Sequence, residues 1–187
     1  MTEATPARKR GRPTEAERAQ RRDEILDAAV KLFVANGFDG VTFDDIREEA
    51  RVTKRTIYND FATRSEIFLA AVERLRERAL AHPGDGSLPE LAARIVMILH
   101  SDEAIDLHRL VIASARDFPE LGERFYRDGP QSYIAALRRH TPDHAEALFT
   151  LLLGEPHRRR LLGLTSAPSA AEAAELATAA LSLLRLG

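Results

Sequence analysis

Apolar residues recur at spacings of three and four along most of the chain, which is the period of a helix with one buried face. The first such segment runs from about residue 15 to residue 36, and its apolar stripe includes Ile25, Leu32 and Phe33. Gly37 is placed to end this helix in a left-handed conformation, with Phe38 folding back on its last turn. No alternating stretch is long enough to predict a strand, so the pattern predicts an all-α protein.

Two short helices are expected next, at residues 42–50 and 53–61. Thr42 can cap the first, and Asp45 three residues later completes a capping box. A turn at residues 51 and 52 leads to Thr53, which can cap the second helix. Two short helices joined by a turn are the layout of a helix-turn-helix, with the second helix placed to enter the major groove of DNA.

Longer amphipathic helices fill the rest of the chain. A second capping box at residues 63–66 begins a helix that runs to about residue 81, and the sequence HPGDGS at 82–87 interrupts the pattern. Rear helices are expected at 87–100, 101–116, 118–129 and 130–140. A leucine-rich helix from 143 is interrupted at 154–156, and a last helix follows a loop at 165–170. The expected domains are a flexible basic arm (1–14), a DNA-binding domain with its connecting helix (15–81) and a helical regulatory and dimerisation domain (87–187).

Charge is distributed unevenly along the 187 residues, although the net charge is only −2. Residues 8–22 carry a net charge of +5 and residues 51–64 a net charge of +3. From residue 65 to the end, 14 cations face 17 acids. A basic front and a mildly acidic rear suggest a nucleic-acid face combined with another function.

Several classes of protein are excluded by composition. The chain has no cysteine, which rules out disulfides, thiolate catalysis and zinc–thiolate sites. No apolar segment follows the basic N-terminal residues, so a signal peptide is not expected, and no run approaches the ~20 apolar residues of a membrane span. A cytoplasmic location is therefore the default expectation.

The helix at 53–61 has the chemistry of a DNA-reading helix. Ile57 and Phe61 lie four residues apart and can anchor it to the core. Arg55 and Asn59 are the candidates for reading base edges, because Arg pairs bidentately with guanine and Asn with adenine. The further candidates for DNA contact, mainly to phosphates, are Thr42, Thr53, Lys54, Thr56 and Tyr58. The alternative interpretation is a helical hairpin that contacts another protein.

The N-terminal arm contains Arg10-Gly11-Arg12-Pro13. Arg10 and Arg12 can lie in a narrow A·T minor groove, whose negative potential attracts arginine. The alternative is a solvated basic tail.

The block ILDAAVKLFVANGFDGVTFDDIREEARVTKRTIYNDFATRSEIFLAAV at residues 25–72 resembles the DNA-binding domain of TetR-family transcriptional regulators. The resemblance implies a homodimer whose all-helical rear domain binds a small inducer and dimerises through its last two helices. Arg51 and Arg55 stand where many family members have glycine. The turn at Arg51 therefore either avoids positive φ or carries strain, and Arg55 adds reach and charge to the reading helix. Residues 108–130 also resemble the C-terminal domain of an AefR-like subgroup.

Apolar residues at helical spacing in the rear unit are candidates for a ligand cavity, although most of them would serve equally well as ordinary core. The candidates for ligand contact are Met97, His100, Leu107, Val111, Ile112, Phe118, Phe125, Tyr126 and Tyr133. The candidates for the dimer interface are Leu148, Leu151, Leu152, Leu176, Leu183 and Leu184. A small, mostly apolar effector would suit such a cavity.

No catalytic set, cofactor motif or metal-binding spacing is found, so an enzyme is not expected. The sequence predicts a repressor that responds to a ligand and binds a palindromic operator in double-stranded DNA as a homodimer. Two alternatives remain open. One is a DNA-binding protein without a ligand, whose rear domain is a filled dimerisation module, and the other is an enzyme whose residues are not recognisable.

Overall fold

The computed structural model describes residues 14–80 and 86–186. Its described part is built from helices alone, so the prediction of an all-α protein is confirmed. In chain order the helices are α1 (Glu15–Asn36), α2 (Phe43–Glu49), α3 (Lys54–Asp60), α4 (Arg64–Leu80), α5 (Leu88–Leu99), α6 (Asp102–Ser114), α7 (Pro119–Asp128), α8 (Pro130–Arg138), α9 (Ala145–Leu161) and α10 (Ala170–Leu183).

Side-chain caps fix where several helices begin. Thr42 and Asp45 form the expected capping box of α2, and Ser87 and Glu90 form the box of α5. At α4 the predicted box is only half formed. The Thr63 hydroxyl accepts a hydrogen bond from the Glu66 amide, but the Glu66 carboxylate accepts one from Ala62 rather than from Thr63. The Glu66 side chain therefore caps the backbone at Ala62, one residue earlier than the capping box predicts.

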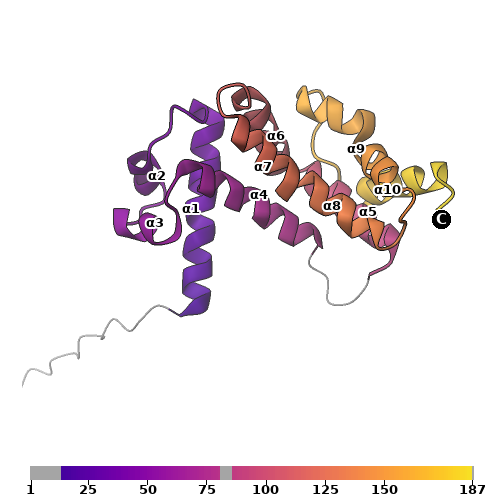
Figure 1. Cartoon of the computed structure of the whole chain (residues 1–187), viewed down its shortest axis with the longest axis horizontal. Coiled ribbons are helices and arrows are strands. Elements are labelled where there is room, and N and C mark those ends of the chain that lie inside the picture. The colour runs from indigo at the N-terminus through magenta and orange to yellow at the C-terminus, as the bar shows by residue number, and fades with distance from the viewer. Residues whose placement is uncertain (1–13, 81–85, 187) are drawn as a thin grey trace, which may run out of the picture.

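Figure 1 shows α1, α2 and α3 together at one end of the molecule, with α4 running from them into a bundle of the remaining helices. Helix α10 lies along α5 at the far end, and α6, which packs on both α1 and α7, lies at the end of the bundle nearest α1. Helix α4 packs on both α1 and α5. A displacement within the bundle can therefore reach the first three helices through α4.

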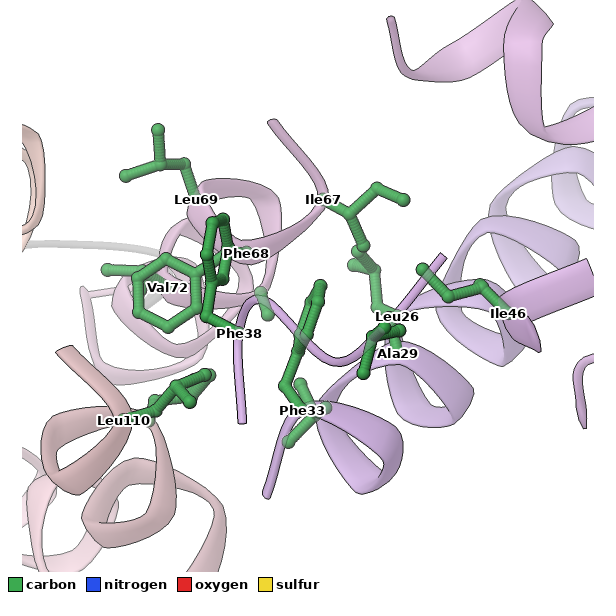
Figure 2. Packing of buried hydrophobic residues seen from close by; sticks show 14 of the residues in the cluster. Leu26, Ala29, Phe33, Phe38, Ile46, Ile67, Phe68, Leu69, Val72 and Leu110 are labelled. Atoms are coloured by element: carbon green, nitrogen blue, oxygen red, sulfur yellow. The ribbon is translucent and has the colours of Figure 1, made fainter. Parts of the chain in front are cut away.

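The core around α1 extends into the rear bundle. The Phe38 ring stacks on Phe33 at 5.3 Å and meets Phe68 and Phe118 edge-on. Figure 2 shows Leu110 of α6 facing the same group of side chains. The first three helices are therefore not an isolated unit, because α6 contributes to the core that holds them.

The end of α1 at Gly37 and the interruption of α9 near Gly154 were both predicted, and both are present. Gly37 has φ +74°, which is positive as expected, but its ψ of 166° lies outside the left-handed helical region. Gly154 has φ +49° and ψ −152°, and Pro156 follows it within α9. The predicted interruption of α9 at 154–156 is thus present as a kink between two helical halves.

The described helices include none with both the length and the apolar character needed to span a membrane.

Candidate nucleic-acid interface

Helix α3 is held by its two apolar residues, as predicted. Ile57 and Phe61 are both buried in the core that contains Phe33 and Phe68. The guanidinium of Arg22, on α1, lies over the Phe61 ring at 4.6 Å from its centroid, a cation–π contact. Helix α3 therefore has a fixed orientation relative to α1, although it is only seven residues long.

The opposite face of α3 presents Arg55 and Asn59 to solvent. They lie one helical turn apart, so their side chains project from the same face. Within the described residues, neither side chain has a hydrogen-bond or ion-pair partner. Both are therefore free to form the paired hydrogen bonds that reading a base edge requires.

Tyr58 is half exposed, with 51% of its surface accessible. Its ring packs edge-on against Phe43 of α2, with 5.0 Å between the ring centroids. This aromatic contact fixes the angle between the two helices, and the remainder of the ring stays available on the surface.

Two of the predicted phosphate-binding hydroxyls are already engaged with each other. The amide of Thr56 donates to the Thr53 hydroxyl oxygen at 3.2 Å, and the two hydroxyl oxygens lie 2.7 Å apart. The pair caps the start of α3. Any phosphate that binds there must share these groups with the cap.

Lys54 has a partner that the sequence did not indicate. Its Nζ lies 3.3 Å from a carboxylate oxygen of Asp44, which also faces Arg47. Both Lys54 and Asp44 are largely exposed, and exposed ion pairs of this kind contribute little to stability. A phosphate would therefore compete with Asp44 for the lysine.

Thr42 lies at the exposed N-terminus of α2, beside an acidic group. Its amide and hydroxyl both donate to Asp45 Oδ2, at 2.8 Å and 2.7 Å. These hydrogen bonds from Thr42 lower the pKa of the Asp45 carboxyl. A phosphate contact at Thr42 would thus have to form next to a carboxylate, which argues for a weaker contact than the sequence alone suggested.

For the turn between α2 and α3 the sequence left two possibilities open, a conformation without positive φ and a strained one. The structure has the strained one. Arg51 has φ +53°, in the left-handed region that disfavours residues with a Cβ. The conformation lets the Val52 amide donate to the Arg47 carbonyl at 3.1 Å, so the last turn of α2 closes before α3 begins.

Arg64 holds the segment between α1 and α2, a role that its neighbours in the sequence do not indicate. Its Nη1 lies within hydrogen-bond distance of the carbonyl oxygens of Phe38, Asp39 and Val41, at 2.9, 2.9 and 2.8 Å. The guanidinium also lies over the Phe38 ring. Arg64 therefore fixes the loop that delivers Thr42 to the start of α2. The acceptors lie more than 20 residues earlier in the chain, so no local pattern could have shown this contact.

Arg10 and Arg12 of the predicted minor-groove arm lie outside the described residues.

A small, partly open cavity of about 50 Å³ lies where α4 meets the rear bundle. Of the nine residues predicted for ligand contact, Leu107, Phe125 and Tyr133 line it. Met97, Ile112 and Tyr126 are instead exposed on the surface, and Val111 and Phe118 pack into the core around α1. His100 is buried, but its ring is bonded to the Leu152 carbonyl. None of those six positions lines this cavity.

Two histidines that the sequence did not single out, His108 and His157, line this cavity. The His157 ring lies between those of His100 and His108, with 5.2 Å to each centroid. Burial, followed by the neighbouring His100 and His108, lowers the pKa of His157 to about 4. Burial also lowers the pKa of His100 and His108 and raises the pKa of Tyr133. All four groups are therefore neutral near pH 7.

The described residues contain no group of three or more acidic or histidine side chains arranged to hold a metal ion.

The predicted dimer residues divide into two groups. Leu148 and Leu152 are buried in the rear core of the same chain, so they have no surface to offer to a partner. Leu176 and Leu184 are partly buried against the same core, whereas Leu151 and Leu183 are exposed. The prediction placed Leu148 and Leu152 outside because the leucine-rich pattern of α9 does not distinguish its two faces.

Both ends of the chain match known family models. The model described as "Bacterial regulatory proteins, tetR family" matches residues 25–71, and that of the "AefR-like transcriptional repressor, C-terminal domain" matches residues 86–184. Among curated relatives, the negative transcriptional regulator IcaR of Staphylococcus epidermidis is 36% identical over 52 residues, 28% of each chain. The transcriptional regulator YdeS of Bacillus subtilis is 32% identical over 118 residues, 58% of this chain and 56% of its own. These alignments span less than two thirds of either relative.

Solved structures match over more of the chain. A putative TetR-family regulator from Mesorhizobium loti aligns with a TM-score of 0.64 and 26% identity, over 91% of this chain and 96% of its own. A TetR-family member from Streptomyces coelicolor aligns with a TM-score of 0.63 and 26% identity, over 86% and 98%. Since the C-terminal model alone covers more than half of the 187 residues, and the N-terminal model covers the helix-turn-helix, this chain belongs to the TetR family of DNA-binding transcriptional regulators.

Proposed function

We propose that this regulator is a ligand-responsive repressor that binds a palindromic operator as a homodimer. The observation that carries the proposal is the exposed, unpartnered pair Arg55 and Asn59 on a helix anchored by Ile57 and Phe61. Such a pair reads bases directly, while Lys54 and Tyr58 contact the phosphate backbone. In this proposal α1–α4 form the DNA-binding domain and α5–α10 the regulatory and dimerisation domain.

Dimerisation through α9 and α10 is supported by the apolar surface there. Leu151 and Leu183 are exposed, as are Leu162 and Leu164 in the loop between the two helices. A two-fold dimer would place two copies of α3 in successive major grooves, with half-sites separated by one or more helical turns. The operator is accordingly an imperfect palindrome.

Repression is supported by the description of the C-terminal family model, which is that of a transcriptional repressor. IcaR is named a negative regulator, although another relative, FasR of Mycolicibacterium smegmatis, is named an activator. A repressor of this kind leaves its operator when an effector favours a conformation with wrongly spaced reading helices. A coupling free energy of about 1–3 kcal/mol between the two sites is enough for this response.

The cavity in the rear bundle is the proposed effector site, and its small volume also favours a second function. At about 50 Å³ it has room for no more than a few water molecules. If the rear domain were a filled dimerisation module, the protein would bind DNA without responding to a ligand. The two functions share the DNA-binding face and differ in whether the cavity opens.

Selection of genomic fragments by the purified protein tests the DNA-binding part of the proposal. We expect enrichment of palindromes, a mass of two protomers in light scattering, and loss of sequence preference in Asn59→Ala. The matched control is Asn36→Ala, an exposed asparagine at the end of α1. Enrichment without symmetry, or an unchanged preference in Asn59→Ala, contradicts the proposal. The enriched genes also provide promoters on which repression and activation can be distinguished.

A further inference from the structure

The cavity in the rear bundle has an unusual lining. Five of its side chains are aromatic rings, from His108, Phe125, Tyr133, Phe149 and His157. Tyr133 and Phe149 stack with their planes at 10° to each other, and the His108 ring lies 5.5 Å from that of Phe125. The remaining lining residues are Val72, Leu75, Leu99, Ala104, Leu107, Gly129, Pro130 and Leu153. The walls are thus flat, apolar and free of charged side chains.

Three polar groups are nevertheless present in this lining. Tyr133 and His157 are more than nine-tenths buried, and His108 is partly buried. Among the described residues, the Tyr133 hydroxyl and the nitrogens of His108 and His157 have no hydrogen-bond partner. In the described residues the fully buried side-chain polar atoms without a partner are the Nε atoms of Arg74 and Arg76, so the Tyr133 and histidine atoms keep some access to solvent. They are therefore available to a polar group of a ligand that occupies the cavity.

A ligand that hydrogen-bonds these three groups is expected to be uncharged. Burial lowers the pKa of His157 to about 4, so this side chain is neutral at pH 7. The nearby cation Arg160 is bonded to the His100 carbonyl, the Thr165 carbonyl and Asp102. Arg76 and Arg78, whose charges act on Tyr133, are paired with Glu73 and Glu103. An anion in the cavity would therefore have to compete with carboxylates for a counter-charge, whereas a hydroxyl group can both donate to a neutral imidazole and accept from one.

A route into the cavity passes through α9. Phe149, Leu153 and His157 line the cavity and also line an open cleft of about 780 Å³ beside α8 and α9. These three side chains therefore form a wall one residue thick. The kink at Gly154 and Pro156 lies in this wall, where the helix loses its regular hydrogen bonds. Rotation of the wall side chains would join the cavity to the cleft. The joined space would then be large enough for the aromatic ring of a ligand.

We propose that the effector is a small neutral compound with a flat ring and one hydroxyl group, of the phenol class, which enters through the wall formed by Phe149, Leu153 and His157. This inference rests on the proposed ligand-responsive function and adds the chemistry of the ligand. The ring lies among the aromatic side chains, and its hydroxyl group hydrogen-bonds His157 and Tyr133.

Three probes of one shape test the inference on the full-length protein: 4-methylphenol, toluene and 4-methylbenzoate. Calorimetry at pH 7.5 is expected to show 4-methylphenol binding about tenfold more tightly than toluene, because toluene leaves the polar groups unpartnered. The anion 4-methylbenzoate is expected to bind more weakly than either. The reverse order, or no binding of any probe at millimolar concentration, overturns the inference.

Variants locate the binding. His157→Phe keeps a ring in the wall but removes its nitrogens, so the preference for 4-methylphenol over toluene is expected to fall about tenfold. Leu153→Trp fills the wall and is expected to abolish binding of both probes. The control is His140→Phe, at an exposed histidine between α8 and α9. Equal loss in the control, or an unchanged preference in His157→Phe, overturns the inference.

Operator binding is measured separately, with and without each probe. If 4-methylbenzoate binds and releases the operator while 4-methylphenol does not, the ligand class is wrong and the ligand-responsive function stands. If 4-methylphenol binds as expected and the operator is retained, the ligand class stands and the regulatory function fails.

Discussion

The Nε2 atom of His100, at the end of α5, lies 3.1 Å from the carbonyl oxygen of Leu152 in α9. In an uninterrupted helix this carbonyl accepts a hydrogen bond from the amide four residues later. That residue is Pro156, which has no amide hydrogen. His100 therefore supplies the donor that Pro156 lacks, and it must be the tautomer with its hydrogen on Nε2. This hydrogen bond holds the kink of α9 against the end of α5.

Replacing His100 by alanine is expected to lower the free energy of unfolding by about 1–3 kcal/mol, because a buried carbonyl loses its donor. Urea denaturation measures the change, with the exposed His140→Ala as control. In the background of His100→Ala, Pro156→Ala restores an amide four residues after Leu152 and is expected to recover part of the loss. Equal stability of His100→Ala and wild type would show that the contact is not needed.

The protonation of His157 makes stability depend on pH. Its pKa in the fold is about 4, below the ordinary value of 6.5, so the unfolded chain binds this proton first as the pH falls. The free energy of unfolding therefore decreases through the window from 6.5 to 4, by about 2 kcal/mol between pH 7.5 and pH 5 from this group alone. His100 and His108 act in the same direction.

Urea denaturation of His157→Phe at several pH values isolates this contribution from that of the carboxylates. The variant is expected to lose less stability than wild type on acidification, whatever its stability at pH 7.5. His140→Phe, at an exposed position, should keep the wild-type slope. Parallel slopes for His157→Phe and wild type would show that His157 is not held neutral by the fold.

Local features of the fold could be predicted from sequence because their causes lie within a few residues. The caps at Thr42, Thr53 and Ser87 each bond a group three residues away, and the four-residue spacing of Ile57 and Phe61 determines which face of α3 is buried. The kink of α9 was visible for the same reason, since Gly154 and Pro156 act on their own segment.

Contacts between distant segments could not be predicted in this way. Arg64 bonds carbonyls 23 to 26 residues away, and His100 bonds one 52 residues away. The cavity depends on how five helices and the end of α5 meet, so periodicity identified apolar candidates but not which of them face inward. His108 and His157 were missed because each looks like an ordinary helical histidine until α6 and α9 are placed side by side.

The positive φ of Arg51 predicts a stabilising substitution. Glycine adopts this conformation without the steric cost that a Cβ carries, which is about 1 kcal/mol. Arg51→Gly is therefore expected to raise the free energy of unfolding by up to about 1 kcal/mol. The control Arg55→Gly, in the first turn of α3, should instead lower the free energy of unfolding, because glycine has a low helix propensity. A decrease in stability for Arg51→Gly would show that the arginine side chain makes a contribution larger than the strain.

The ion pair of Lys54 with Asp44 provides a test of the proposed phosphate contact of Lys54. Lys54→Gln is expected to weaken binding to all sequences and to reduce the slope of log affinity against log salt by about 1. Asp44→Asn removes the competing carboxylate and should strengthen binding several-fold at low salt. Fluorescence anisotropy on specific and random duplexes measures both effects. If Asp44→Asn leaves affinity unchanged at low salt, Lys54 does not meet a phosphate.

Arg74 of α4 joins three helices through one guanidinium. Its Nη2 lies 2.8 Å from Asp27 of α1 and also bonds Glu103 of α6, and its Nη1 lies 3.3 Å from the Asp23 carbonyl. Only 15% of the side chain is exposed, so these contacts are less screened than those on the surface. Glu103 is shared with Arg78, one turn further along α4. A movement of α6 in the rear bundle would therefore alter the contact between α4 and α1, the helix against which α2 packs.

We expect Arg74→Met to lower the free energy of unfolding by about 2 kcal/mol, the range of hydrogen bonds to charged groups. The control is Arg116→Met, at an exposed arginine without a partner among the described residues. Combined with Glu103→Gln, the loss should be smaller than the sum of the single losses, because both substitutions break the same contact. The same double-mutant cycle is then measured on operator affinity. It shows whether Arg74 and Glu103 only stabilise the fold or also act together on DNA binding. Additive effects on both stability and operator affinity would mean that Arg74 does not couple α6 to α1. A loss of operator affinity in the double variant that is smaller than the sum of the single losses would mean that this guanidinium couples the rear bundle to the first three helices.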